Sequence, residues 1–341
     1  MARADKAPQE PASTARAGAA DHAMEHGCAR PPVAIVTVNY NGRPFIGEFL
    51  RSVAALDYPA VRLIVVDCAS RDGSPDLIAR RAPWAVLLRC ADNLGFTGGS
   101  NLGIRWALAR GFPYILFLNN DTTFSPDLVS VLVARAGPRT LVVPRVLLHG
   151  TELMDDTVGE FDLRRGVWRN WVFGRPCPPE LSCQREVAMA SLCCLLAPAS
   201  VFRHVGLLDE RLFMYYEDFD FILRARSAGY RLWYVPTATV YHRKSASSGG
   251  GETPFKVYYA TRNRVALVRR HGSRAGFVRF TLDFTVTRLL RTAQYVGTGR
   301  RDLAAALLRG WLDAYRGCMG RTFLPPTAPD AGPGVGHADR H

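Results

Sequence analysis

The apolar run at residues 114–118, which ends abruptly in two asparagines and Asp121, constrains the fold of this chain more than any other feature. Five apolar or aromatic residues after Pro113 predict a buried strand. In an open α/β sheet, side chains just past the carboxyl end of a strand face the ligand crevice. Asp121 is therefore placed to meet a cation and a phosphate, although a polar turn capped by Asp121 is the alternative.

The same pattern recurs along the first half of the chain. The expected strands are residues 33–38, 62–66, 85–89 and 114–118, and candidate polar residues close the first, second and fourth of them. Helical patterns lie between these strands, and this alternation predicts right-handed strand–helix–strand units in a doubly wound, mostly parallel sheet flanked by helices. The carboxyl edge of such a sheet binds nucleotides. Its candidate nucleotide-binding residues are Asn39, Asn41, Asp67, Asn119 and Asn120.

Asp67 follows the second expected strand, where an acidic side chain can accept hydrogen bonds from a nucleoside. Taken alone, it is more often a turn or cap residue. The dinucleotide-binding fingerprint of three glycines is absent after the first strand, since Asn39-Tyr40-Asn41-Gly42 occupies that position. This absence counts against a dehydrogenase.

A glycine-rich stretch at residues 93–101 precedes an expected helix. Backbone N–H groups at such a position can cradle phosphates, which makes Asn93, Gly95, Gly98 and Asn101 candidate donor-binding residues. A flexible connector is the alternative, because glycine clusters also mark ordinary loops. The stretch contains no Gly-Lys-Ser/Thr and is not a Walker loop.

Three acidic residues, Glu217, Asp218 and Asp220, lie within four positions among aromatic and apolar residues. On a helix, Glu217 and Asp220 share one face while Asp218 points elsewhere. A carboxylate among aromatic rings can have a raised pKa, which suits a proton acceptor near neutral pH. The alternative is that these acids only favour the first turn of a helix through its dipole.

His242 follows the expected strand at residues 231–241. A neutral imidazole is an acceptable ligand for Mn²⁺, and it would support a site with a single carboxylate. Most isolated histidines in this position are surface or capping residues, which is the alternative here.

The composition is that of a globular protein, with 341 residues of which 48% are hydrophobic. We expect a disordered leader (1–31), a catalytic domain (32–253), a helical extension (254–320) and a disordered tail (321–341). The leader lacks the apolar region of a signal peptide, and no uncharged apolar run of 18 residues occurs. We therefore expect a cytoplasmic protein. The eight cysteines have neither C-x-x-C nor zinc spacing and predict reduced thiols.

The charge is uneven: residues 262–316 hold twelve of the arginines and three acids, in a chain of net charge +13. Such a segment suggests an anionic partner, either a lipid surface or phosphates, and a solvated basic face is the alternative. In the same region Leu303, Leu307 and Trp311 form an apolar stripe at helical spacing. This stripe packs on the core or lies on a bilayer interface, and we favour packing.

Six segments in this order resemble the family 2 inverting glycosyltransferases of the GT-A fold, particularly their rhamnosyltransferase-like branch. These segments are residues 38–41, 65–74, 93–101, 118–121, 216–220 and 240–242. The resemblance covers residues 32–270. It implies a nucleotide-diphosphate-sugar donor such as dTDP-rhamnose or a UDP-sugar, a divalent Mg²⁺ or Mn²⁺ ion, and a single displacement at the anomeric carbon.

Carried over residue by residue, the resemblance places Asp67 on the nucleoside, with Asn39 and Asn41 nearby. Asp121 corresponds to the metal-binding acid and Asp218 to the catalytic base, next to Glu217.

His242 matches a histidine that helps to hold the metal or the diphosphate. Asn119 occupies the first acidic position of the metal-binding motif, which leaves one carboxylate, and Cys68 replaces the usual Asn. The expected acceptor is a hydroxyl of a glycan or of a lipid-linked glycan, and no nucleic acid is expected. The charge count alone suggests that the basic C-terminal segment contacts the inner face of the cell membrane, where such an acceptor would be held. The competing classes are a nucleotidyltransferase-like enzyme and a catalytically silent nucleotide-binding protein on a similar sheet.

Overall fold

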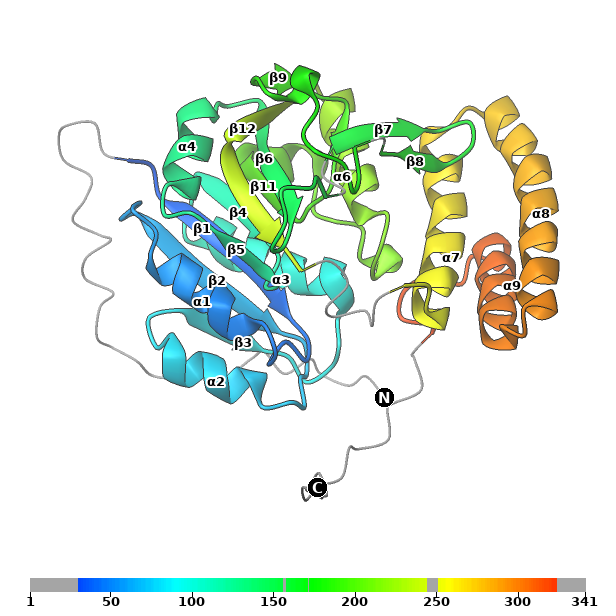
Figure 1. Cartoon of the computed structure of the whole chain (residues 1–341), viewed down its shortest axis with the longest axis horizontal. Helices are drawn as coiled ribbons and strands as arrows, with labels where there is room; N and C mark the ends of the chain where they lie inside the picture. Colours follow the sequence, from blue (N-terminus) through cyan, green and yellow to red (C-terminus); the bar gives the residue numbers. More distant parts are fainter. Residues whose placement is uncertain (1–29, 156–157, 171, 244–250, 324–341) are drawn as a thin grey trace, which may run out of the picture.

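The structure is a computed structural model that describes residues 30–155, 158–170, 172–243 and 251–323. The large sheet at its centre is built from β1 (Val33–Asn39), β2 (Val61–Asp67), β3 (Val86–Arg89), β4 (Tyr114–Leu118), β5 (Thr122–Phe124), β6 (Thr140–Leu148), β9 (Arg185–Glu186), β11 (Cys194–Pro198) and β12 (Arg231–His242). The strand order is β3-β2-β1-β4-β11-β6-β12-β5, and β9 pairs with β12 (Figure 1).

The N-terminal half of this sheet is parallel, as the alternation of strands and helices predicts. Strands β3, β2, β1 and β4 run in one direction, and the register pairs Asn39 with Asp67 at their carboxyl ends. Beyond β4 the sheet is mixed: β11 is antiparallel to both neighbours, whereas β12 is parallel to β6. The predicted α/β class is confirmed, and the parallel half carries the polar strand ends.

Helices cover both faces of the sheet, because its strands are apolar on both sides. The helices are α1 (Ile46–Ala54), α2 (Ser74–Arg81), α3 (Gly95–Ala109), α4 (Leu128–Arg135), α5 (Ala199–Val205) and α6 (Glu217–Ser227). Along β1, Ala34 and Val36 pack with residues of α3, α5 and α6, while Val33 and Ile35 pack with residues of α1, α2 and α4. Burial on both faces explains why the strand sequences read as continuous apolar runs.

A second sheet of three short strands lies beside the first: β7 (Val158–Asp162), β8 (Val167–Arg169) and β10 (Met189–Ala190), in the order β10-β7-β8. The sequence predicts one strand over residues 187–197, and this prediction is wrong. The chain pairs with β7 at residues 189–190 and joins the central sheet only at β11. A continuous apolar run does not reveal that its two ends belong to different sheets.

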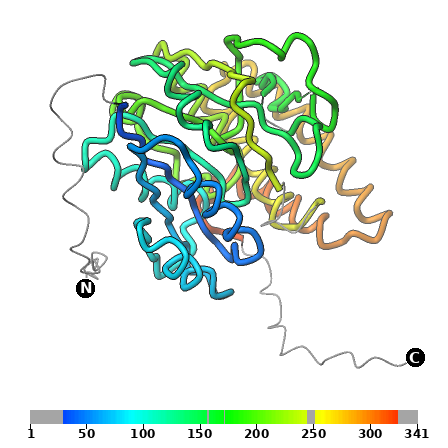
Figure 2. Tube along the Cα trace, turned by 60° about the vertical axis from the view of Figure 1, so that its left-hand side comes forward, coloured from blue at the N-terminus to red at the C-terminus, as the bar shows by residue number. Residues whose placement is uncertain are grey.

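Three helices follow the sheet: α7 (Pro254–His271), α8 (Arg274–Gly297) and α9 (Arg301–Arg316). Figure 1 and the rotated view in Figure 2 show α8 at the outer side of the molecule. Leu303 and Leu307 are buried and Trp311 is partly buried, so the predicted packing of this stripe is confirmed. No helix in the described part of the chain is long and apolar enough to cross a bilayer.

Most of the expected leader and tail lies outside the described residues. The seven cysteines within the described residues are free.

Candidate active site

A buried network joins the carboxyl ends of β1, β2 and β4. The Asn39 side-chain N–H₂ donates to Asp67 Oδ2 at 2.7 Å and to Ser74 Oγ at 2.9 Å. Its Oδ1 accepts a hydrogen bond from Asn120 Nδ2 at 2.9 Å. Ser70 N donates to Asp67 Oδ1 at 3.1 Å, so both carboxylate oxygens are oriented. The structure thus brings together three residues that the sequence placed at separate strand ends.

Asn41 fixes the loop after β1 to the loop after β2. Its backbone N–H donates to Ser70 Oγ, and its Oδ1 accepts from Arg71 N, each at 2.9 Å. Asn41 has a φ of 51°, a left-handed conformation that asparagine tolerates better than most residues. Its side chain is therefore held at the exposed rim of the Asn39–Asp67 network.

Asp121 lies one residue beyond Asn120 and contacts a buried histidine. His242 Nε2 lies 3.2 Å from Asp121 Oδ1, and His242 Nδ1 lies 2.6 Å from Asp155 Oδ2. Burial opposes a charged imidazole, but the Cys193 thiol and the two carboxylates raise the pKa of His242 well above its usual value. The histidine is thus held between two acids that lie more than thirty residues apart in the chain.

Asp121 offers a carboxylate oxygen and His242, once its imidazole is neutral, a ring nitrogen, and a divalent cation accepts both kinds of donor. A metal-binding histidine usually bonds to a carboxylate through its other nitrogen, as His242 does with Asp155. Within the described residues, no group of three His, Cys, Asp or Glu side chains could hold a metal. Substrate phosphates would have to complete the coordination.

Asn119 is fixed through its backbone. Its N–H donates to Cys193 O at 2.9 Å, and its carbonyl accepts from Thr122 Oγ1 at 2.7 Å. Because Asn119 is neutral, the acids of this part of the site are Asp121 and Asp155, and the sequence analysis missed Asp155. It lies in an irregular stretch without periodicity, so no local signal marks it.

The glycine-rich stretch is not a loop, contrary to the sequence prediction, because α3 begins at Gly95. Its glycines permit close packing: a Cβ on Gly95 would meet the Phe213 backbone, and one on Gly98 would meet Leu94. Asn93 Oδ1 accepts from Gly95 N at 2.9 Å.

Asn101 Nδ2 donates to Leu208 O and to Glu210 Oε1, both at 2.9 Å. The contacts of the glycine-rich residues thus hold the fold together, and their role in donor binding stays a prediction.

The three acids of α6 have different environments. Glu217 is buried, and burial followed by the negative charge of Asp218 raises the pKa of Glu217 well above its usual value. Asp218 is half-buried, and its Oδ1 accepts a hydrogen bond from Phe219 N at 2.8 Å. Glu217 and Asp220 are both buried, as their predicted shared face requires. Of the three, Asp218 is the most accessible to a substrate.

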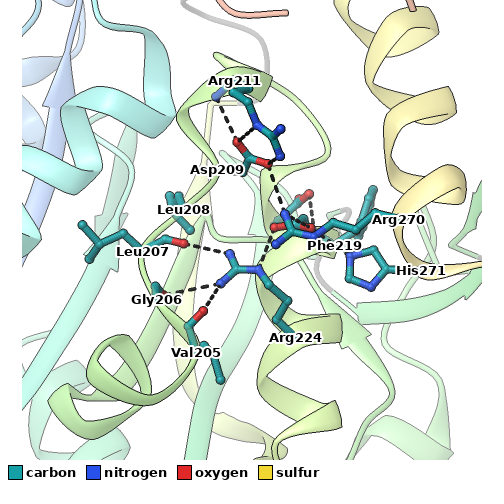
Figure 3. A network of polar contacts seen from close by, with 12 residues as sticks. Val205, Gly206, Leu207, Leu208, Asp209, Arg211, Phe219, Arg224, Arg270 and His271 are labelled. Carbon is teal, nitrogen blue, oxygen red and sulfur yellow. Dashed lines mark hydrogen bonds and ion pairs between the residues drawn. The ribbon is translucent and has the colours of Figure 1, made fainter. Parts of the chain in front are cut away.

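Asp220 belongs to a structural network whose partners Arg224, Arg270 and His271 are labelled in Figure 3. It pairs with Arg224 at 2.9 Å and with Arg270 at 3.0 Å, and His271 Nε2 lies 2.8 Å from it. Burial opposes its charge, but the hydrogen bond from His271 and the two guanidinium groups lower the pKa of Asp220 below its usual value. Figure 3 also shows Arg224 bonded to backbone carbonyls of residues 205–207. Asp220 therefore ties α6 to α7.

The segment that leads into α6 reaches the same edge of the sheet as Asp67. Phe213 O accepts from Thr97 N at 3.3 Å in the first turn of α3. Gly95 O, in the same turn, lies 4.0 Å from the Sγ of Cys68, which follows Asp67 directly. Helix α6, whose second residue is Asp218, thus follows a segment that contacts the carboxyl edge of the parallel strands.

We predict that Glu217→Gln stabilises the protein increasingly as pH rises. Between pH 4.5 and the raised pKa, folded Glu217 keeps a proton that the unfolded chain loses, so wild-type stability falls with pH. Glutamine does not titrate, so it removes this pH-dependent loss of stability, and it has nearly the same shape as the Glu217 side chain. Denaturant unfolding of both proteins from pH 4.5 to 8.5 measures the effect, and a stability difference that does not change with pH would contradict it.

The comparisons with known proteins agree with this architecture. The glycosyl transferase family 2 model matches residues 34–178. The chain is 28% identical over 280 residues to the N-acetylglucosaminyl-diphospho-decaprenol L-rhamnosyltransferase of Mycobacterium tuberculosis, covering 74% of this chain and 88% of that protein.

Two solved structures share the fold. Staphylococcus aureus TarS with UDP-GlcNAc has a TM-score of 0.55 and 14% identity, covering 83% of this chain and 81% of TarS. The mannosyltransferase PcManGT from Pyrobaculum calidifontis, in complex with GDP-Man and Mn²⁺, has a TM-score of 0.52 and 15% identity. The match covers 84% of this chain and 87% of PcManGT. The chain therefore carries a glycosyl transferase family 2 domain at residues 34–178 and has the GT-A fold of these two glycosyltransferases.

Proposed function

We propose that this protein is an inverting glycosyltransferase that moves a sugar from a nucleotide diphosphate sugar to a hydroxyl group of a glycan or lipid-linked acceptor. The donor would be dTDP-rhamnose or a UDP-sugar. The observation that carries the proposal is the pairing of Asp121 with His242 beside the Asn39–Asp67 network, at the carboxyl edge of parallel strands. The relative from Mycobacterium tuberculosis is named for transfer of rhamnose to a diphospho-decaprenol acceptor, which supports this choice of substrates.

The nucleoside would bind against Asp67. Each carboxylate oxygen of Asp67 already accepts one hydrogen bond, Oδ2 from Asn39 and Oδ1 from Ser70. Each oxygen keeps a further lone pair that can accept a hydrogen bond from the nucleoside. The side chain is therefore oriented before the substrate arrives. Asn41, at the exposed rim, would lie beside the bound nucleotide.

Asp121 and His242 would hold a Mg²⁺ or Mn²⁺ ion against the diphosphate, and Asp155 would keep the imidazole in the orientation that this contact requires. A bound divalent cation would stabilise the negative charge that develops on the departing nucleoside diphosphate. The mannosyltransferase with GDP-Man and Mn²⁺ supports a divalent ion on this fold.

Asp218 would act as the general base that removes the proton from the acceptor hydroxyl as it attacks the anomeric carbon. Burial and the negative charge of Asp218 raise the pKa of neighbouring Glu217 well above its usual value. Glu217 is also buried, so the half-buried Asp218 is the more accessible carboxyl group of the pair, and Glu217 would support it as a neighbour. A single displacement of this kind inverts the anomeric configuration and needs no covalent sugar–enzyme intermediate.

We also propose that the enzyme works at the inner face of the cell membrane, in the synthesis of a polysaccharide or cell-wall glycan. A lipid-linked acceptor would be held at that surface, and the basic segment at residues 262–316 supports a contact with it.

A panel of nucleotide sugars with Mg²⁺ or Mn²⁺ tests the proposed reaction. Release of nucleoside diphosphate from one donor is the expected result. Release of pyrophosphate would instead indicate a nucleotidyltransferase, and release of neither product from any donor would indicate a silent nucleotide-binding protein.

A further inference from the structure

The outer face of α8 is apolar and exposed. Five aliphatic side chains are each more than half exposed: Val278 (60%), Leu282 (66%), Val286 (58%), Leu289 (54%) and Leu290 (67%). Val278, Leu282, Val286 and Leu290 recur every four residues and Leu289 lies three residues after Val286, so all five lie on one side of the helix. We call this set the α8 stripe. A contiguous aliphatic patch of this kind on a soluble protein usually marks an interaction site.

The opposite face of α8 packs against the neighbouring helices. Phe280 and Phe284 are buried against the neighbouring helices, and Arg288 lies over the Phe284 ring with its guanidinium carbon 4.8 Å from the centroid. The α8 stripe is therefore not needed to hold the helix in place. It is an additional apolar surface on the outer side of the molecule, where Figure 1 and Figure 2 place α8.

Arginines surround the first turn of the α8 stripe. Arg269 and Arg274 line a cavity of about 540 Å³ together with Phe277, Val278 and Tyr315. Arg279 is exposed on the next position of the helix. Among the ion pairs of the described residues, none involves Arg269, Arg274 or Arg279. Exposed aliphatic groups thus lie beside arginines that form no ion pair within the described part of the chain.

We propose that the α8 stripe docks on a bilayer that contains anionic lipids, with its aliphatic side chains at the boundary of headgroups and acyl chains and the three arginines on lipid phosphates. A helix with aliphatic residues on one face and arginines at its border binds membranes in this orientation. This inference rests on the proposed function and deepens it, because it names the surface that presents the acceptor.

A second copy of the chain fits this surface less well. Both ends of α8 are basic: Arg269, Arg274 and Arg279 lie at one end, and Arg300 and Arg301 follow the other. A parallel or antiparallel pairing of two stripes would bring arginine toward arginine, whereas an anionic bilayer neutralises both ends.

The position of α8 relative to α6 suits a lipid-linked acceptor. The guanidinium carbons of Arg264 and Arg288 lie 4.9 and 4.8 Å from the centroid of Phe284, on the inner side of α8. Both arginines act electrostatically on Tyr216, as does Asp218. The α8 stripe is thus separated from Arg264 and Arg288, which face the start of α6, by about the diameter of one helix, roughly 10–12 Å. A sugar carried on a lipid diphosphate would reach Asp218 from this side.

Sedimentation of the full chain with vesicles tests the proposal. We expect binding to vesicles of equal phosphatidylcholine and phosphatidylglycerol, and at least about tenfold weaker binding to pure phosphatidylcholine. The triple variant Leu282→Ser, Val286→Ser, Leu289→Ser should lose at least about tenfold in binding to the anionic vesicles. The variant Arg269→Gln, Arg274→Gln, Arg279→Gln should bind more weakly and with a smaller dependence on salt.

A matched control is the double variant Thr287→Ser, Gln294→Ser, which introduces serines at exposed positions of α8 outside the stripe. It should bind vesicles like the wild type, and circular dichroism should show that all variants are folded. Equal vesicle binding by the triple serine variant and the wild type would overturn the proposal. So would a wild-type dimer in light scattering that the triple serine variant abolishes.

The vesicle assay does not depend on catalysis. Release of nucleoside diphosphate with a soluble acceptor should be the same in the triple serine variant and in the wild type. Loss of vesicle binding by a protein that keeps this activity would support the docking surface. If the wild type binds anionic vesicles through the α8 stripe but releases no nucleoside diphosphate from any donor, the proposed function fails and the docking surface stands.

Discussion

Asp218→Asn is expected to lower the rate of sugar transfer by about 10²–10⁴-fold while donor affinity stays within about twofold of the wild type. Asparagine keeps the shape of the side chain and can still accept the hydrogen bond from Phe219 N, but it cannot take a proton from the acceptor. Steady-state release of nucleoside diphosphate measures the rate, and calorimetric titration of the donor measures its affinity.

The control for this variant is Asp76→Asn, at an exposed acid of α2 whose ion pair with Arg89 is also exposed. It should leave both quantities unchanged. Full activity of Asp218→Asn would remove Asp218 from the role of base. Loss of donor affinity equal to the loss of rate would assign it to donor binding instead.

Arg262→Met is expected to destabilise the protein by at least about 3 kcal/mol. Arg262 is fully buried, and its guanidinium donates to the carbonyl oxygens of Gly320, Leu212 and Arg211 at 2.7, 3.0 and 3.1 Å. Methionine fills much of the space but donates no hydrogen bond, so each of these carbonyl oxygens loses its charged guanidinium donor. Denaturant unfolding measures the effect. Arg316→Met, at an exposed residue of α9, is the control and should change stability by less than about 0.5 kcal/mol.

Equal stability of the two methionine variants would show that the Arg262 network contributes nothing to the fold. The network matters for the site because Asn263, the next residue, holds the turn before α6. Its Nδ2 donates to the carbonyl oxygens of Leu212, Met214 and Tyr215. Tyr215 and Tyr216 both have positive φ, which is unfavourable for aromatic residues and must be imposed by such contacts. Helix α7 thus fixes the turn from which Asp218 projects.

The part of the site that the sequence predicts well is the part built from strand ends. Buried strands read directly as apolar runs, and parallel strands carry their last residues to one edge. Asn39, Asp67 and Asn120 therefore meet as expected, and Asp121 follows on the same edge. The apolar stripe of α9 at Leu303, Leu307 and Trp311 was also predictable, because helical spacing of apolar residues identifies the face of a helix that packs.

The remaining features depend on contacts that sequence patterns do not encode. Glycine occurs both in flexible loops and where helices pack closely against other elements. The glycines after Asn93 therefore predict a loop from sequence, although they belong to α3, which needs small residues there. Gly99 faces Val38 and Cys68, and Gly103 faces Val36. Asp155 reaches His242 from a segment without regular structure. The positive φ values before α6 are likewise imposed by a helix about fifty residues further along the chain.

The anomeric configuration of the first product is the most direct test of the account. Once a donor is identified, proton NMR during the first turnovers reports whether the new glycosidic bond has the configuration of the donor. A single displacement assisted by Asp218 and by a cation at Asp121 predicts inversion. Retention of configuration would require a different chemistry and would contradict the assignment of Asp218 as a base.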